Sequence, residues 1–373
     1  MTFLRTRFEW LDVLSAKSSI AAELALKTKL ADEIYKTQNK KALNKDAFNL
    51  SNNNDHNDIL ASTIDGLAAK GADLKNLSKL LVDLTSRNTY GTFCEISAYG
   101  YLLKGKHDFD IQLPMDGSAI LNPHGADLDG LLRLPQEVAF DVKAFGFHEH
   151  LVSRLTERLS YDLAPDIVVA QDSWDVPIST LFDLLSTQYE QLVQELRQSR
   201  SAARDAIRFV VRTPARVQVS SRELDPGKLA RKNADYAFSY AKQFARHKPF
   251  ILVFVIHPWA SGALHVNFYG YVDDFTQALA QITFCQFMAD TSPIFDVTKS
   301  HASQLLSGIL FMNAWAGTPP AEPPLYRLFL NPNAINPLHP ASVETLAAPY
   351  GDDMTVTKIQ CPSAQSDPLR GDM

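Results

Sequence analysis

The sequence predicts an α/β fold in which helices flank a mixed β-sheet, with a helical region at the N-terminus and a helical extension at the C-terminus. Three observations lead to this prediction. Apolar residues recur at helical spacing in the first part of the chain, and two strand-like runs meet at Pro135-Gln136-Glu137 as in a tight hairpin. The uninterrupted apolar run at 250–256 predicts a strand that is buried on both faces.

The composition is that of a globular protein with a sizeable core, because 46% of the 373 residues are hydrophobic and 21% are charged. The sequence divides into four predicted parts. In order, these are an N-terminal helical region at 1–86, a core at 87–272 with an insertion around 147–226, a helical and proline-rich region at 273–350, and a disordered tail at 351–373.

The elements of the core follow from local spacing. Apolar residues recur every three or four positions over 92–103, which predicts a helix, and residues 108–113 alternate, which predicts a strand. The hairpin then comprises 128–134 and 138–145. Beyond it, helices are predicted at 148–159, 178–204, 228–247 and 276–313, and strands at 166–170, 209–220, 250–256 and 263–272.

Two alternatives remain for the strand that completes the core sheet beside the hairpin. The helix at 228–247 with the strand at 250–256 is one, and the helix at 148–159 with the strand at 166–170 is the other. The continuous apolar run favours the first alternative, in which 147–226 is an insertion.

The three cysteines, Cys94, Cys285 and Cys361, lie far apart and include no CxxC pair. This spacing argues against a disulfide scaffold and against a zinc ribbon, and it favours a reducing compartment. The first residues contain no apolar segment typical of a signal peptide, and no apolar run approaches the ~20 residues that span a bilayer. We therefore expect a cytoplasmic protein without a membrane partner.

The net charge of −6 conceals a basic segment. Residues 197–248 contain thirteen Lys and Arg against four acidic residues, a balance of +9 that leaves −15 on the remainder. A basic segment on an acidic chain predicts contacts with phosphates, although a solvated helix face is an alternative interpretation. The candidate nucleic-acid contacts are Arg204, Arg208, Lys228, Arg231, Lys232, Lys242 and Arg246.

Acidic residues and one lysine share a face of the predicted hairpin. Residues two apart on a strand point the same way, so Asp127 lies beside Asp129 on the first strand and Asp141 beside Lys143 on the second. Pairing of the strands would bring Asp129, Asp141 and Lys143 together. Two carboxylates can bind Mg²⁺, and a nearby ammonium can hold a water molecule, which is a suitable arrangement for phosphodiester hydrolysis.

The arrangement resembles the PD-(D/E)XK, or restriction-endonuclease-like, nuclease superfamily, over about residues 87–146. That core has a helix bearing Glu, a strand bearing Asp, and a second strand bearing (D/E)-x-K. Glu95, Asp129 and Asp141-Val142-Lys143 stand at these places. Gln243 resembles a polar position that some relatives place beside the site.

The sequence departs from the family pattern at Leu128, where proline is usual, and this leaves Asp127 as a rival to Asp129 for the metal. A second Asp-x-Lys copy, Asp73-Leu74-Lys75, lies in a helical stretch with no acidic hairpin strand before it. We interpret that copy as a solvated helix surface.

The resemblance implies a restriction-endonuclease-like fold and a metal-dependent endonuclease. It implies that Asp129 and Asp141 bind Mg²⁺, or Mn²⁺ in its place, that Glu95 completes the shell directly or through water, and that Lys143 orients the attacking water. It also implies DNA rather than RNA as the substrate, work in restriction or phage defence, and a homodimer for cutting both strands. The alternative is a non-catalytic nucleic-acid-binding or assembly protein on the same scaffold.

Overall fold

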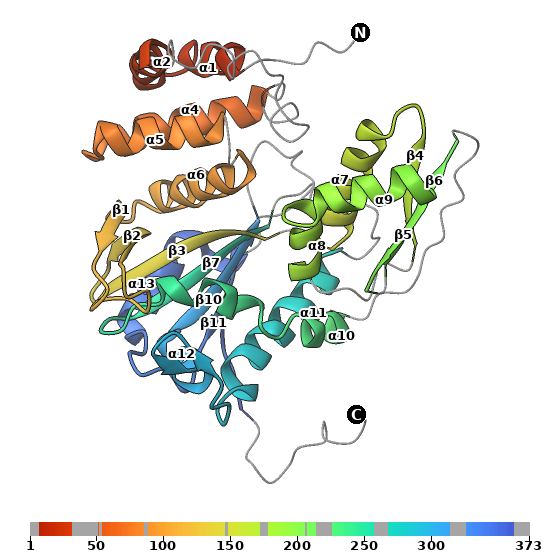
Figure 1. Cartoon of the computed structure of the whole chain (residues 1–373). Helices are drawn as coiled ribbons and strands as arrows, with labels where there is room; N and C mark the ends of the chain where they lie inside the picture. Colours follow the sequence, from red (N-terminus) through yellow and green to blue (C-terminus); the bar gives the residue numbers. More distant parts are fainter. Residues whose placement is uncertain are drawn as a thin grey trace.

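A seven-stranded mixed sheet runs through the centre of the molecule, in the order β1-β2-β3-β7-β10-β11-β12 (Figure 1). Neighbouring strands are parallel from β3 to β10 and between β11 and β12, and they are antiparallel elsewhere. The computed structural model describes residues 7–31, 51, 54–85, 89–145, 148–171, 178–205, 207–213, 226–256, 268–313 and 326–361. The strands are β1 (Phe109–Met115), β2 (Ala126–Arg133), β3 (Glu137–Phe145), β7 (Phe250–Ile256), β10 (Gly308–Asn313), β11 (Tyr326–Leu330) and β12 (Met354–Lys358).

Strand β7 lies in the middle of this sheet and is buried along its whole length. Its even-numbered residues pack into one hydrophobic cluster and its odd-numbered residues into another, on the opposite face of the sheet. The absence of polar alternation in this run therefore reflects burial on both faces, as the sequence predicted.

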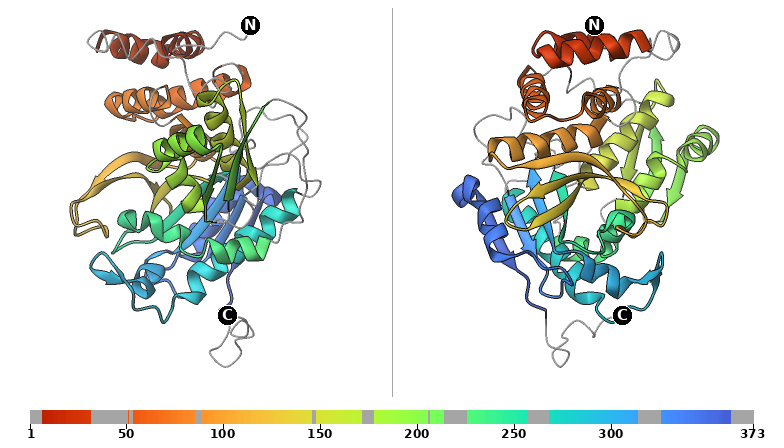
Figure 2. Two further views of the ribbon diagram at one scale, coloured as in Figure 1. Left: turned by 45° about the vertical axis from the view of Figure 1, so that its right-hand side comes forward. Right: turned by 90° about the vertical axis from the view of Figure 1, so that its left-hand side faces the viewer.

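Helices cover one face of the sheet in layers, of which α6 lies directly on β3 and β7 (Figure 2). Helices α4 and α5 pack on α6, and α1 and α2 pack on them in turn. Helix α13 adds to the same hydrophobic cluster beside α6. The bounds are α1 (Arg7–Ser15), α2 (Ser19–Ala31), α4 (Asn54–Ala69), α5 (Leu74–Leu84), α6 (Thr89–Lys104) and α13 (Pro340–Ala347), which the 3₁₀ helix η6 (Ala348–Asp353) follows.

The opposite face is covered by helices that contribute to the second hydrophobic cluster. A small two-stranded sheet, β8 with β9, lies beside α12. The bounds are α10 (Pro226–Lys232), the 3₁₀ helix η3 (Tyr236–Gln243), α11 (Phe268–Gln281), the π-helix η5 (Ile282–Gln286), β8 (Pro293–Ile294), β9 (Val297–Thr298) and α12 (Lys299–Leu305).

An accessory unit is inserted between β3 and β7, and we call its three-stranded sheet, in the order β4-β6-β5, the accessory sheet. Because β7 pairs with β3 while β4 belongs to the accessory sheet, the first of the two alternatives for the core is the one observed. The unit comprises α7 (His148–Asp162), β4 (Ile167–Gln171), α8 (Ile178–Leu185), α9 (Tyr189–Ser199), β5 (Ser201–Arg204) and β6 (Ile207–Arg212).

The predicted C-terminal helical extension is wrong in part, since β10 and β11 lie within it and join the main sheet. Strand β10 ends the stretch 276–313, which was predicted to be helical. Its six residues are buried like those of β7, and a short apolar run of this kind does not distinguish a buried strand from a buried helix. Strand β12 likewise lies within the segment predicted to be a disordered tail.

Three other predicted elements differ from the structure. The helix at 228–247 is replaced by α10 and the 3₁₀ helix η3, and the helix at 178–204 by α8, α9 and β5. The strand at 263–272 is wrong from residue 268 onward, where α11 begins, and 263–267 lie outside the described residues. Of the strand at 209–220, β6 covers the part up to Arg212, and 214–220 are outside the described residues.

A disulfide joins Cys285 of η5 to Cys361, which follows β12. The disulfide contradicts the inference of a reducing compartment from the cysteine spacing. The sequence did not predict this pair, because 76 residues separate the two cysteines and only the return of β12 to the sheet brings them together. The third cysteine, Cys94, takes no part in this disulfide and is buried in α6.

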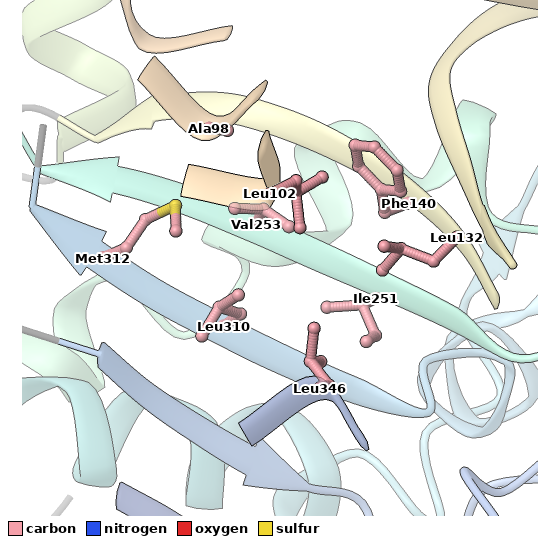
Figure 3. A pocket seen from close by; sticks show the side chains of 9 residues that line it. All are labelled: Ala98, Leu102, Leu132, Phe140, Ile251, Val253, Leu310, Met312 and Leu346. Carbon is pink, nitrogen blue, oxygen red and sulfur yellow. The ribbon is translucent and has the colours of Figure 1, made fainter. Parts of the chain in front are cut away.

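A small cavity of about 20 Å³ lies between α6, α13 and the sheet (Figure 3). It is large enough for about one water molecule, but its lining offers no polar partner for one. The lining residues are Ala98, Leu102, Leu132, Phe140, Ile251, Val253, Leu310, Met312 and Leu346. We regard it as a packing defect in the core.

Among the residues that the structure describes, no helix is long and apolar enough to cross a bilayer.

Candidate functional site

The site begins where the regular pairing of β2 with β3 ends, at Gly130 opposite Phe140. One residue further along β2, Oδ2 of Asp129 accepts a hydrogen bond from the backbone N–H of Val142 at 2.6 Å. The carboxylate of Asp129 thus takes the place of a backbone acceptor and is held against β3. This contact fixes a charged side chain at the edge of a buried strand pair.

Gly130 permits the close approach of the strands around Asp129. A Cβ atom at this position would lie 2.3 Å from Cζ of Phe140 and 2.5 Å from the backbone oxygen of Asp110 on β1. No side chain fits within these distances, so glycine is required here by the packing of β1, β2 and β3.

Asp141 is fully buried on β3, with 0% of its surface exposed. Its Oδ1 accepts a hydrogen bond from Nε2 of Gln243 on η3 at 2.8 Å. Its Oδ2 accepts no hydrogen bond of normal geometry from the described residues and instead forms an ion pair with Nζ of Lys143. Nζ also lies 4.0 Å from Oδ2 of Asp129 and 5.5 Å from the centre of the Tyr240 ring. One ammonium therefore bridges the two carboxylates.

Glu95 reaches the cluster from α6. Its Oε1 accepts hydrogen bonds from the hydroxyl of Tyr99, one helical turn later, at 2.7 Å, and from Nε2 of Gln112. The same Tyr99 hydroxyl lies 2.8 Å from the backbone oxygen of Asp129. Tyr99 therefore connects the helix to β2, and its single proton is shared between two acceptors.

Gln112 adopts an unusual backbone conformation that aims it at Glu95. Its φ of 51° lies in the left-handed region, although the residue is within β1 and is not glycine. Its Nε2 donates to Glu95, and its Oε1 accepts from Nζ of Lys79 on α5 at 3.1 Å. Backbone strain of this kind is often found at functional sites, because the surrounding structure must hold it in place.

The electrostatics of the cluster follow from burial of like charges. Loss of solvation, reinforced by the charge of Asp129, raises the pKa of Glu95 to about 8. Burial, with the same neighbouring charge, also raises the pKa of Asp141. For Lys143, burial acts to lower the pKa, but the charges of Asp141 and Asp129 outweigh burial and the pKa lies above its usual value. Lys143 is therefore a cation at neutral pH.

Asp127 lies outside the cluster. Its side chain is exposed and forms an ion pair with Nζ of Lys79 at 3.2 Å. Of the two rival aspartates on β2, the structure brings only Asp129 to Asp141 and Lys143.

The predicted nucleic-acid contacts fall into two groups. Arg204 forms an ion pair with Glu195, and Arg246 binds both oxygens of Asp296, so these two guanidinium groups are committed to the fold. Arg208, Arg231 and Lys242 are exposed and have no acidic partner within the described ranges. Lys228 is exposed as well, and the side chain of Lys232 lies outside the described part of the structure.

The donor set at the site fits Mg²⁺ better than Zn²⁺. No group of three or more His, Cys, Asp or Glu is placed to hold a metal ion among the residues described. Mg²⁺ commonly needs only one or two carboxylates, with water and substrate phosphates completing its shell, whereas a zinc site normally uses at least three protein ligands. Oδ2 of Asp141 already faces the Lys143 ammonium, and the buried Oε1 of Gln243 accepts no hydrogen bond from the described residues.

Glu95, Asp129, Asp141 and Lys143, which the sequence singled out, thus lie in one polar cluster. Sequence reasoning missed Tyr99 and Gln112 and found only a faint signal for Gln243. Tyr99 is four residues after Glu95 on one helix face, which could have indicated its contact. Nothing in the local sequence marks the conformation of Gln112.

Comparisons of the chain with protein-family models, with curated protein sequences and with solved structures found no match to any of them.

Proposed function

We propose that the chain is a Mg²⁺-dependent nuclease that hydrolyses phosphodiester bonds, with DNA as its substrate. The observation that carries the proposal is the convergence of Asp129, Asp141, Lys143 and Glu95 from three separate elements into one buried cluster. A structural domain has no evident need for three carboxyl groups in so little solvent, since burying them costs stability.

In this proposal Asp129 and Asp141 hold Mg²⁺, and Glu95 completes the shell directly or through water. The ion would neutralise charge on the phosphodiester and lower the pKa of a bound water. Mn²⁺ would serve in its place. Gln243 keeps the Asp141 carboxylate in its orientation through the bond to Oδ1.

The charge state of Lys143 determines which part it can take in the reaction. Because the ammonium remains protonated at neutral pH, it orients the attacking water and stabilises negative charge on the phosphate rather than removing a proton. Arg231 and Lys242, which are exposed and free of acidic partners in the described chain, are suited to bind flanking phosphates. Work in restriction or phage defence would be consistent with this chemistry, as would a homodimer that cuts both strands.

The test is divalent-dependent cleavage of a supercoiled plasmid and a long duplex. We expect cutting with Mg²⁺ or Mn²⁺, and we expect Asp141→Asn and Lys143→Met each to lower the rate by about 10²- to 10³-fold. Asp73→Asn is the matched control, because it alters the second Asp-x-Lys copy and yet leaves a residue that can still cap α5. Equal loss in the control and the site variants would argue against the site.

A non-catalytic nucleic-acid-binding protein is the second candidate. The full burial of Asp141 and its ion pair with Lys143 favour it, because a bound ammonium competes with a metal for the same carboxylate. In that case wild type binds duplex in a salt-sensitive manner but cuts nothing with any divalent ion, and Lys143→Ala leaves binding unchanged. In that case, calorimetric titration with Mg²⁺ would also give the same result for wild type and for Asp129→Asn, because no ion binds at the site.

A further inference from the structure

The accessory sheet has one face packed on helices and one face turned away from them. Along β6 the odd-numbered residues Ile207, Phe209 and Val211 are buried in the hydrophobic cluster with α7, α8 and α9. Arg208 and Arg212 alternate with them and are exposed. Strand geometry therefore places both arginines on the other face. They lie four residues apart, with Val210 midway between them, so their backbones are separated by roughly 13 Å.

The strand register identifies the rest of this outer face. Arg208 lies opposite Gln171 of β4 and Ala203 of β5, and Arg212 lies opposite Ile167. No acidic residue occurs among these positions, and most of the side chains around the arginines are short or uncharged. The outer face consists of Ile167, Val169, Gln171, Ser201, Ala203, Arg208, Val210 and Arg212.

The arginines of the outer face differ in their partners from other arginines nearby. Arg200 forms an ion pair with Asp166 at 2.9 Å, and Arg204 forms one with Glu195 at 2.6 Å. Arg208 and Arg212 have no such partner in the part of the chain that the structure describes. No carboxylate of the described residues therefore neutralises their charge.

The composition of the face indicates what kind of anion it fits. Protein interfaces concentrate their binding energy in Trp, Tyr and Arg, and surfaces that bind single strands stack bases on aromatic rings. The outer face has the arginines but no aromatic residue beside them. Two guanidinium groups without an acidic partner among the described residues, on a face whose other side chains are uncharged, suit a repeating phosphate backbone, which arginine binds through paired hydrogen bonds.

We propose that the outer face of the accessory sheet is a docking surface for the backbone of duplex nucleic acid, with Arg208 and Arg212 as its phosphate contacts. The unit that carries it begins at His148, three residues after the end of β3, the strand that holds Asp141 and Lys143 (Figure 1). The surface would hold the nucleic acid at a second place besides the candidate site, whatever the base sequence. It rests on the proposed function only in taking nucleic acid as the ligand.

The test is a salt titration of duplex binding by the full chain in EDTA, so that no cutting occurs. In Arg208→Gln/Arg212→Gln, loss of two phosphate contacts should lower the slope of log affinity against log salt by about 1.8. Between about 50 and about 200 mM salt, wild type should then lose about twelvefold more affinity than the variant. Arg208→Lys/Arg212→Lys, which keeps both charges, should retain most of the wild-type slope.

The matched control is Arg200→Gln/Arg204→Gln, which removes the same net charge from the same unit but from arginines that are already paired. We expect its slope to remain close to that of wild type. Equal slopes for wild type and the Arg208/Arg212 variant, or an equal fall in the control, would overturn the docking surface. Circular dichroism and thermal unfolding of each variant would confirm that the accessory unit is folded.

Failure of this proposal is distinguishable from failure of the nuclease proposal. A protein that binds duplex through Arg208 and Arg212 but never cuts the plasmid would overturn the nuclease and support the surface. A protein that cuts in an Asp141-dependent manner, with a salt slope that the double variant does not change, would support the nuclease and overturn the surface.

Discussion

Lys143 is the residue on which the charge balance of the candidate site depends. Its ammonium lies beside Asp141 and Asp129, and the ring of Tyr240 is within reach of a cation–π contact. Removing this cation would leave two carboxylates facing each other with little solvent between them. A neutral substitution at 143 should therefore affect the site even before any substrate is present.

Glu95 provides a prediction about pH. Its pKa is about 8 in the folded chain against 4.5 for an unperturbed glutamate, so between these values the folded protein retains a proton that the unfolded chain has lost. Without divalent metal, the free energy of unfolding should fall as pH rises through this window, by up to about 1.4 kcal/mol per pH unit from this group. Urea unfolding in EDTA at several pH values measures the slope.

The matching variant is Glu95→Gln, which keeps the size of the side chain and has no proton to lose. Its stability should decline less steeply than that of wild type over the same window, while the raised pKa of Asp141 still contributes in the same direction. Parallel curves for the two proteins would show that Glu95 is not held in its protonated form.

For individual residues, the sequence predicted membership of the site where the position of the side chain follows from regular strand or hairpin geometry. Period-two spacing places Asp141 and Lys143 on one face of a strand, and a hairpin brings Asp129 to them. Gln112 could not be found in this way, because its role depends on a positive φ imposed by the surrounding fold. The ion pair of Asp127 with Lys79 joins residues far apart in sequence and was equally hidden.

The β2–β3 hairpin is the element that assembles the site, and a substitution at Gly130 tests its role. Gly130→Ala places a methyl group against Phe140 and the backbone of β1, so we expect a loss of about 1–3 kcal/mol in the free energy of unfolding. We also expect lower activity, because the strands that carry Asp129 and Asp141 must separate. Ala203→Val adds methyl groups at an exposed strand position and serves as the control for stability alone. Equal stability of the two variants would contradict the close approach.

Element types were predictable where length or periodicity was decisive and not elsewhere. Strand β7 was identified from its uninterrupted apolar run. Strand β10 has the same buried character but was taken as the end of a predicted helix, because a strand and a helix can have the same apolar pattern over six residues. The 3₁₀ helix η3 was taken as part of one long helix, since its spacing departs from α-helical spacing only slightly.

At the scale of the whole molecule, the disulfide joins the far edge of the sheet to the helices. We expect reduction, or Cys285→Ser/Cys361→Ser, to lower the free energy of unfolding by about 2–4 kcal/mol. Thermal unfolding with and without a reductant measures this. The reductant should have no effect on the double variant, and a wild-type protein equally stable in both conditions would show that the bond contributes nothing.

The position of the accessory unit between β3 and β7 has a consequence for the order in which the chain folds. Contacts within the unit, such as those of β5 with β6, join residues close in sequence and cost little loop-closure entropy. The pairing of β3 with β7 must bridge the whole unit and is slower. Prior folding of the unit shortens the distance that remains to be closed. Asp141 and Gln243 come from the two sides of that junction, so we infer that the contact between them forms later than the contacts within the β2–β3 hairpin.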